Sequence, residues 1–229
     1  MENTIQHTHR GPHPGILAIV FTCLFNTGLS FVISLSGKSP YYPGPWESAE
    51  VIAAYFQHQS YDVLRCAFFQ FGAAIPLGLF TAAVVSRLQF FKIRATGVYI
   101  ALFGGLMTAF NLALSALILW VMAYPGIAQD TGVLRALYYM GFAVGGVGYS
   151  VPLGLLIAGI SVTGGLTKLI PKWLMWVGLF LAACGELSFL SLLFPKLLFL
   201  IPLTRFPGFL WLIAVGFVLP KKELAFPRP

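Results

Sequence analysis

The stretch "WLMWVGLFLAACGELSFLSLLF" at residues 173–194 contains 22 residues and one charged side chain, that of Glu186. An α-helix rises about 1.5 Å per residue, so a segment of this length crosses the hydrocarbon core of a bilayer, which is about 30 Å thick. The stretch therefore predicts a transmembrane helix. It also raises a question, because a carboxylate inside hydrocarbon is costly unless it has a partner or a proton.

The whole chain shares this composition. Of its 229 residues, 58% are hydrophobic and 9% charged, whereas a soluble domain carries roughly a quarter charged residues. Only helices and closed barrels satisfy their backbone in lipid, and the short alternating segments of a barrel are absent from the sequence. We predict an all-α membrane protein with one six-helix transmembrane domain over residues 15–219, between tails at 1–14 and 220–229. The expected spans are 15–36, 62–86, 97–123, 134–161, 173–194 and 198–219.

The basic residues predict the orientation. With the N-terminus inside, nine lysines and arginines fall in the cytoplasmic segments and five on the other side. Cytoplasmic loops carry the excess of basic residues, so we expect both termini in the cytoplasm. The formal charge of +7 then reflects topology. It does not indicate a nucleic-acid partner, because no basic stripe is interleaved with stacking aromatic residues.

The chemistry-bearing residues do not form a recognisable catalytic or metal motif. Cys23, Cys66 and Cys184 occur singly in different spans, and no CxxC pair is present. No GxSxG, HExxH or phosphate-binding loop occurs either. We therefore predict no catalytic residue, no metal and no cofactor, and we expect the protein not to be an enzyme.

Two segments resemble each other. Residues 75–79 read "IPLGL" and residues 151–155 read "VPLGL", with a spacing of 76 residues. Each lies in a span that is followed by a basic inner loop and a returning span. The pattern predicts a parallel repeat in which helices 2 and 3 form one hairpin and helices 4 and 5 a second, related by rotation about the membrane normal. A chance match in so apolar a chain is the alternative.

Two stripes of small and polar residues follow helical spacing in the third and fourth spans. Such stripes let helices approach closely in lipid and exchange hydrogen bonds. The stripes consist of Gly104, Thr108, Asn111 and Ser115, and of Gly141, Gly145, Gly148 and Pro152.

The connection between the first two spans is too polar to cross the membrane. Ser48 is suited to cap a short helix over residues 48–60, with Glu50 in its first turn. Its apolar residues then share one face, so we expect an interfacial helix on the outer membrane surface. These residues are Val51, Ile52, Tyr55 and Phe56, with Trp46 at the edge.

The polar residues of the spans fall at one depth. Counting along each helix places Glu186 about 20 Å, and Asn111 and Arg205 about 21 Å, from the cytoplasmic boundary. The run from Pro207 to Leu219 is too short to span, so we expect the last span to be broken, with Pro207 in the first turn of its final helix. Arg65 lies about one turn inside the second span.

We therefore predict a buried polar layer of Glu186, Arg205, Arg65 and Asn111, in which Glu186 pairs with Arg205 or, failing that, with Arg65. Two interpretations of this layer stay open. The first is structural, an ion pair or a protonated carboxyl that holds the broken helix. The second is functional, a ligand or proton site open to the outside. If Glu186 neutralises one arginine, the other favours an anionic or carbonyl-bearing ligand.

The chain resembles uncharacterised bacterial six-span membrane proteins, a family of unknown function. The segment "FPGFLWLIAVGF" at residues 206–217 and the glycine-rich fourth span carry this resemblance, which covers most of the chain after residue 14. It implies a multi-pass protein of the bacterial inner membrane and no known activity. No functional residue is carried over from it.

Three functions compete at this point. The first is binding or transport of a small anionic or lipophilic ligand by the polar layer. The second is a non-catalytic accessory or assembly subunit, as the small size and short loops suggest. An intramembrane enzyme is third. The expected partner in every case is the bilayer, and a homo-oligomer or another membrane protein stays open.

Overall fold

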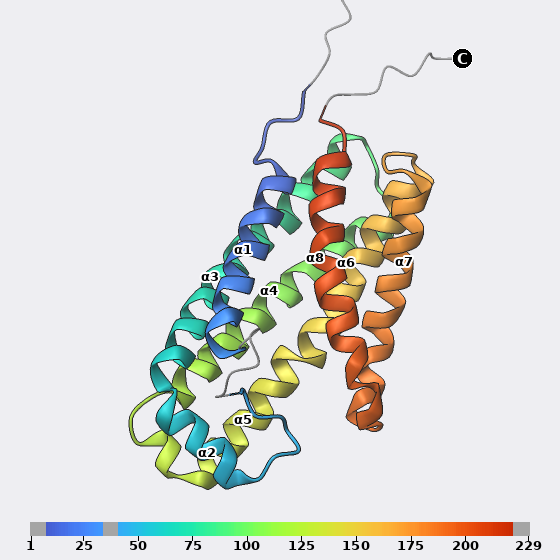
Figure 1. Cartoon of the computed structure of the whole chain (residues 1–229). Helices are drawn as coiled ribbons and strands as arrows, with labels where there is room; N and C mark the ends of the chain where they lie inside the picture. Colours follow the sequence, from blue (N-terminus) through green and yellow to red (C-terminus); the bar gives the residue numbers. More distant parts are fainter. Residues whose placement is uncertain (1–7, 34–40, 222–229) are drawn as a thin grey trace, which may run out of the picture.

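The protein is described here by a computed structural model that covers residues 8–33 and 41–221. Its secondary structure is helical throughout these residues (Figure 1). The α-helices are α1 (Pro14–Val32), α2 (Ala49–His58), α3 (Ser60–Phe90), α4 (Thr96–Met122), α5 (Thr131–Gly145), α6 (Val147–Leu166), α7 (Lys172–Leu187) and α8 (Leu200–Val218). Short 3-10 helices are η1 (Ile127–Gln129), η2 (Ser188–Leu192) and η3 (Pro195–Phe199).

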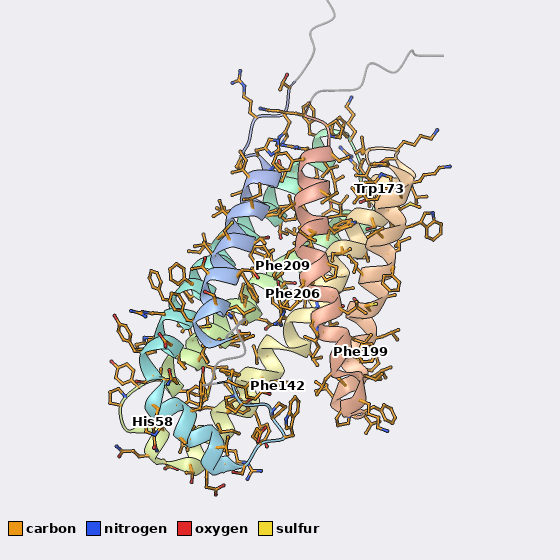
Figure 2. All side chains as sticks on the ribbon, in the orientation of Figure 1. His58, Phe142, Trp173, Phe199, Phe206 and Phe209 are labelled. Atoms are coloured by element: carbon orange, nitrogen blue, oxygen red, sulfur yellow. The ribbon has the colours of Figure 1, made fainter. Side chains whose placement is uncertain are left out.

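Six segments are long and apolar enough to cross a membrane, which confirms the predicted class of multi-pass membrane protein. They are Pro14–Val32, Ser60–Phe90, Thr96–Met122, Thr131–Leu166, Lys172–Leu192 and Pro195–Val218. Large apolar side chains cover the outside of the bundle, and Trp173 projects outward from α7 (Figure 2). Lipid is the solvent for this surface.

The spans form a closed ring. α1 packs on α3, α3 on α4, α4 on α6, α6 on α7, α7 on α8, and α8 returns to α1. Aromatic residues fill the centre, where the ring of Phe209 lies edge-on at 4.9 Å from Phe21 and 5.0 Å from Phe25, measured between centroids. These three side chains are at most 2% exposed, so they form the core of the bundle between α1 and α8.

The two ends of the described chain meet at one end of the bundle, which we call the terminal end (Figure 1). The amide of His9 donates to the carbonyl of Lys221 at 3.0 Å, and Arg87 Nη1 donates to the carbonyl of Leu219 at 2.9 Å. The imidazole Nε2 of His9 also lies 3.0 Å from Ser86 Oγ. Because the described chain has an even number of spans, its two ends lie on the same side of the membrane. That this side is the cytoplasm stays a prediction.

The two predicted stripes face each other where α4 packs on α5 and α6. A Cβ on Gly104 would lie 2.5 Å from the amide nitrogen of Leu156, so only glycine allows this approach. Further along, Ser115 contacts Gly145, and Asn111 Nδ2 donates to the carbonyl of Gly148. The spacing therefore predicted correctly that these faces pack against other helices. Asn111, which was expected in a polar layer with Glu186, donates to a backbone carbonyl instead.

Two helix boundaries were wrong. The fourth span is not one helix, because α5 ends at Gly145 and α6 begins at Val147, with Gly146 between them at φ −88° and ψ −95°. A Cβ on Gly146 would lie 2.5 Å from the carbonyl oxygen of Phe142, which explains glycine at this position. The last helix, conversely, is continuous from Leu200 and contains Pro207 in its interior.

The proposed repeat compares two hairpins. The first consists of α3 and α4, and the second of the interrupted span α5–α6 followed by α7. "IPLGL" lies within α3, which continues through Pro76, whereas "VPLGL" lies in α6, which begins only after the break at Gly146. Both prolines stand inside helices that contact α4. A rotation that superposes the hairpins stays a prediction.

The helix between the first two spans forms as predicted, and Ser48 Oγ accepts from the amide of Val51 at 3.4 Å. Most of its apolar face packs on protein, while Val51 is 49% exposed. Ile52, Tyr55 and Phe56 are buried in a cluster with residues of α3, α4 and α5. α2 therefore covers the end of the bundle opposite the termini, which we call the α2 end, because those side chains gain more burial against protein than at a membrane surface.

Candidate functional site

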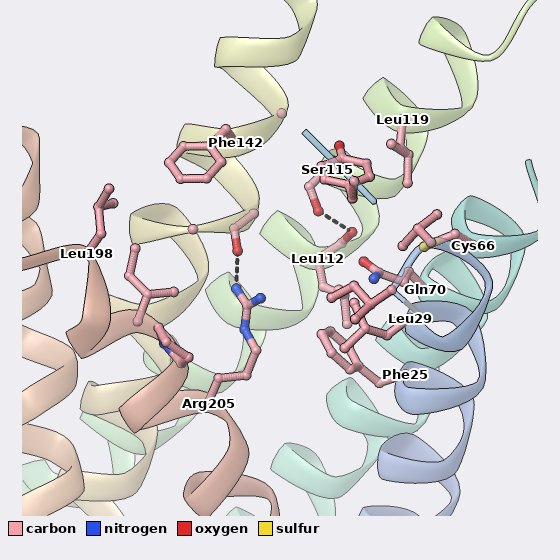
Figure 3. Close-up of a pocket in the computed structure, with 18 of the residues that line it drawn as sticks. Phe25, Leu29, Cys66, Gln70, Leu112, Ser115, Leu119, Phe142, Leu198 and Arg205 are labelled. Atoms are coloured by element: carbon pink, nitrogen blue, oxygen red, sulfur yellow. Dashed lines mark hydrogen bonds between the residues drawn. The ribbon is translucent and has the colours of Figure 1, made fainter. Parts of the chain in front are cut away.

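A pocket of about 380 Å³ opens near the α2 end of the bundle (Figure 3). Six elements contribute to its wall: α1, α3, α4, α5, η3 and α8, together with the loop before α2. Most lining side chains are apolar, and they include Phe25, Leu29, Leu112, Leu119, Phe142, Leu198 and Ile201. The polar contributions come from Gln70, Ser115, Tyr42 and Arg205.

Arg205 is the one charged residue in this lining. α8 carries it into the space between Phe142 and Leu198 on one side and Phe25 and Leu29 on the other (Figure 3). Its Nη2 donates to the carbonyl of Gly145, while its buried Nε has no hydrogen-bond partner among the described residues. A guanidinium has five N–H donors, so most of its capacity remains for another acceptor.

The guanidinium of Arg205 lies over two aromatic rings. Its Cζ lies 4.7 Å from the ring centroid of Tyr149 and 5.6 Å from that of Phe25. Cation–π contacts of this kind contribute about 0.5–2 kcal/mol, which offsets only part of the cost of removing the charge from water. Arg205 is thus positioned precisely by neutral groups, and its charge has no carboxylate beside it in the pocket wall.

The break at Gly146 brings two helix termini to the pocket. Gly145 ends α5, and its carbonyl accepts a hydrogen bond from Arg205. A positive charge is favoured at this position, because the C-terminus of a helix is the negative end of its dipole. Gly146 precedes α6, and its own carbonyl accepts from the amide of Ser150 at 2.9 Å. The first amides of α6 follow directly, at the positive end of that helix. A discontinuous span therefore lines the site.

Two tyrosines of α5 hold the loop before α2 by hydrogen bonds. This loop forms part of the pocket wall. Tyr138 donates its hydroxyl to the carbonyl of Pro43, and Tyr139 donates to that of Pro45 at 3.2 Å. Tyr42 packs its ring edge-on at 5.4 Å from Tyr55 of α2. Burial, and after it the neighbouring Tyr138, raises the pKa of Tyr42 well above its ordinary value.

Glu186 does not line this pocket, and the ion pair predicted for it is wrong. Within the part of the chain that the structure describes, the ion pair joins Arg65 to Asp62, with Nη1 and Oδ1 3.2 Å apart. Glu186 Oε1 is buried without a hydrogen-bond partner and packs against Gly154 of α6. Helix counting does not give the direction in which Glu186 points, and α7 turns it toward α6 instead of toward Arg205.

The other two predicted residues also lie outside the lining. Arg65 is about half exposed on α3, where its guanidinium stacks 4.2 Å from the ring centroid of Tyr61. Asn111 bridges α4 to α6 through Gly148. Of the predicted polar layer, the structure thus brings only Arg205 to the pocket. No group of three or more metal-ligating side chains lies within the described ranges.

Sequence reasoning missed the residues that shape the pocket. The signal for the break was present, because "AVGGVG" at 143–148 places three glycines inside a span of 36 residues, far longer than one crossing needs. Gln70 and Ser115 also line the pocket. Their side chains come from α3 and α4, and only the packing of those helices decides that they line the same pocket as Arg205.

No protein-family model matches the chain, and neither a curated protein nor a solved structure matches it. The geometry described above is therefore the basis for function, and the bacterial origin and family remain predictions.

Proposed function

We propose that this membrane protein binds a lipophilic molecule with an anionic or carbonyl group in the pocket at the α5–α6 break. The observation that carries the proposal is Arg205, whose charge has a carbonyl and two aromatic rings as neighbours and no carboxylate in the described pocket lining. An acidic group on a ligand would supply both the acceptor and the opposite charge.

The composition of the wall supports a lipophilic body for this ligand. A volume of about 380 Å³ falls within the usual range of small-molecule sites. It has room for about a dozen waters, each of which needs two or more polar partners. The few polar side chains in the wall cannot satisfy that many waters, whereas Phe25, Leu29, Leu112 and Phe142 offer good contacts to a hydrocarbon chain or ring.

The discontinuous span supports the same site. In membrane transporters, helices are commonly interrupted where they bind substrate, because the freed helix ends contact the ligand. Here Gly145 and Gly146 supply those ends inside the pocket. On the terminal side the packed rings of Phe21, Phe25 and Phe209 close the bundle. Transport would require these rings to separate, so binding is the first step we propose.

The pocket favours binding over catalysis. Cys66 is a nucleophile in its wall, but the described lining contains no histidine or carboxylate that could activate it. The accessory-subunit interpretation requires no ligand at all. A ligand measurement therefore separates these functions.

The test is equilibrium binding of a fluorescent long-chain carboxylate to the purified protein in neutral detergent. Arg205→Gln should weaken binding about tenfold or more, since it removes a charged hydrogen bond. Arg65→Gln is the matched control, and it should leave affinity unchanged because Arg65 lies outside the pocket. Leu29→Trp keeps the charge and fills the apolar part, so it should also abolish binding. Equal affinity in all four proteins would refute the proposal.

A further inference from the structure

The lining residues differ in exposure according to their place in the pocket. Phe25, Cys66 and Leu112 are at most 2% exposed and form its interior. Ile33, Trp46 and Phe142 are between 36% and 70% exposed, so they form its rim. The rim belongs to the end of α1, the loop before α2, and α5. All of these rim side chains are apolar or aromatic.

The mouth lies between spans. α5 packs on α4, α6 and α2, whereas α8 packs on α1, α6 and α7. Figure 1 shows α5 running away from η3 and the first turn of α8 toward the α2 end. α1, α5 and α8 belong to segments that are long and apolar enough to cross a membrane. An opening between such segments is expected to face hydrocarbon. Molecules reach such a mouth from the bilayer more readily than from water.

The polar side chains of the wall are less exposed than the apolar side chains of the rim. Arg205, Gln70 and Ser115 contribute to the wall behind the rim of Ile33 and Phe142. An amphiphile whose acidic group points inward matches this order. Its chains can stay in the bilayer, and a cavity of about 380 Å³ needs to hold only the headgroup and the first part of the chains.

We infer that the ligand is a membrane lipid with an acidic headgroup, which enters sideways between α1, α5 and α8 from the leaflet at the α2 end. Its carboxylate or phosphate contacts the guanidinium of Arg205 and its chains leave through the rim. This inference rests on the proposed function and adds the ligand class and its route.

The test uses a photoreactive benzophenone amino acid in place of Phe142 at the rim. Phe110 is the matched control position, because it is 60% exposed on α4 and is not part of the pocket wall. The full chain is reconstituted in vesicles of phosphatidylcholine with a minor fraction of phosphatidic acid, and the lipid adducts are identified by mass spectrometry. At position 142 we expect about tenfold enrichment of phosphatidic acid over the vesicle composition, and none at position 110.

Two further arms decide the source of the acidic group. Arg205→Gln should remove the enrichment at position 142, and Arg65→Gln should retain it. Excess inorganic phosphate should leave the adducts unchanged, whereas displacement by phosphate would show that a soluble anion occupies the site. Adducts that follow bulk composition at both positions would overturn lateral lipid entry. If the fluorescent carboxylate still required Arg205 in that case, the proposed function would survive, and if it did not, both would fail.

Discussion

The side-chain amide of Asn111 donates to the carbonyl of Gly148, and that carbonyl is the one that Pro152 leaves without a helical partner. In an α-helix the carbonyl of residue 148 accepts from the amide of residue 152, but proline has no N–H. Asn111 supplies the missing donor across the α4–α6 contact. It does so within one turn of the break at Gly146, so the bond fixes the start of α6 beside the pocket.

This relationship predicts a specific coupling. Asn111→Ala should lower the free energy of unfolding by about 1 kcal/mol, because a buried carbonyl loses its donor. In a Pro152→Ala background the same change should cost less, because residue 152 again offers an amide. A double-mutant cycle in mixed micelles containing dodecyl sulfate measures the coupling. Strictly additive effects would show that the bond does not replace the proline amide.

The contact between α4 and α6 predicts how glycines respond to substitution. Gly104→Ala should destabilise the protein by about 1–3 kcal/mol, because the new Cβ meets backbone atoms of Leu156 and Pro152 that cannot move independently. Gly72→Ala is the matched control in α3, where a Cβ has no atom within 4 Å. That change should be neutral or stabilising, since alanine favours helix by about 1 kcal/mol. Similar unfolding curves for both variants would contradict this contact.

The histidines at the terminal end predict a dependence of stability on pH. Burial, and after it the charges of Arg87 and Lys221, lowers the pKa of His9 and of His13 below 6.5. The unfolded chain therefore binds protons more readily than the folded one. The stability is fully present above about pH 6.5 and is lost as the pH falls toward the lowered pKa values.

Melting temperatures at about pH 8 and about pH 5 test this effect. His9→Gln should reduce the loss on acidification, and the double change with His13→Gln should reduce it further. His58→Gln is the control, because His58 is exposed at the α2 end (Figure 2). If the wild type melted at the same temperature at both values, or if His58→Gln alone removed the loss, the account of the terminal end would be wrong.

The features that could be predicted from the sequence are those that depend on a single helix. Span length, the stripe of Asn111 and the cap at Ser48 follow from local spacing, and the structure has all three. The pairing of Glu186 with Arg205 depended on the rotation of α7 and α8 about their axes. The close contact of Gly185 of α7 with Gly154 of α6 fixes the rotation of α7. The pocket itself needed the break at Gly146, where three nearby glycines were interpreted only as a packing stripe.

The central claim is that an acidic lipophilic ligand occupies the pocket and contacts Arg205. The most direct measurement is an experimental density map of the protein in nanodiscs that contain phosphatidic acid. We predict headgroup density about 3 Å from the guanidinium of Arg205, continuous with chain density that passes Phe142 toward the bilayer. A map in which the pocket is empty or filled by protein side chains, or in which Arg205 pairs with Glu186, would contradict the claim.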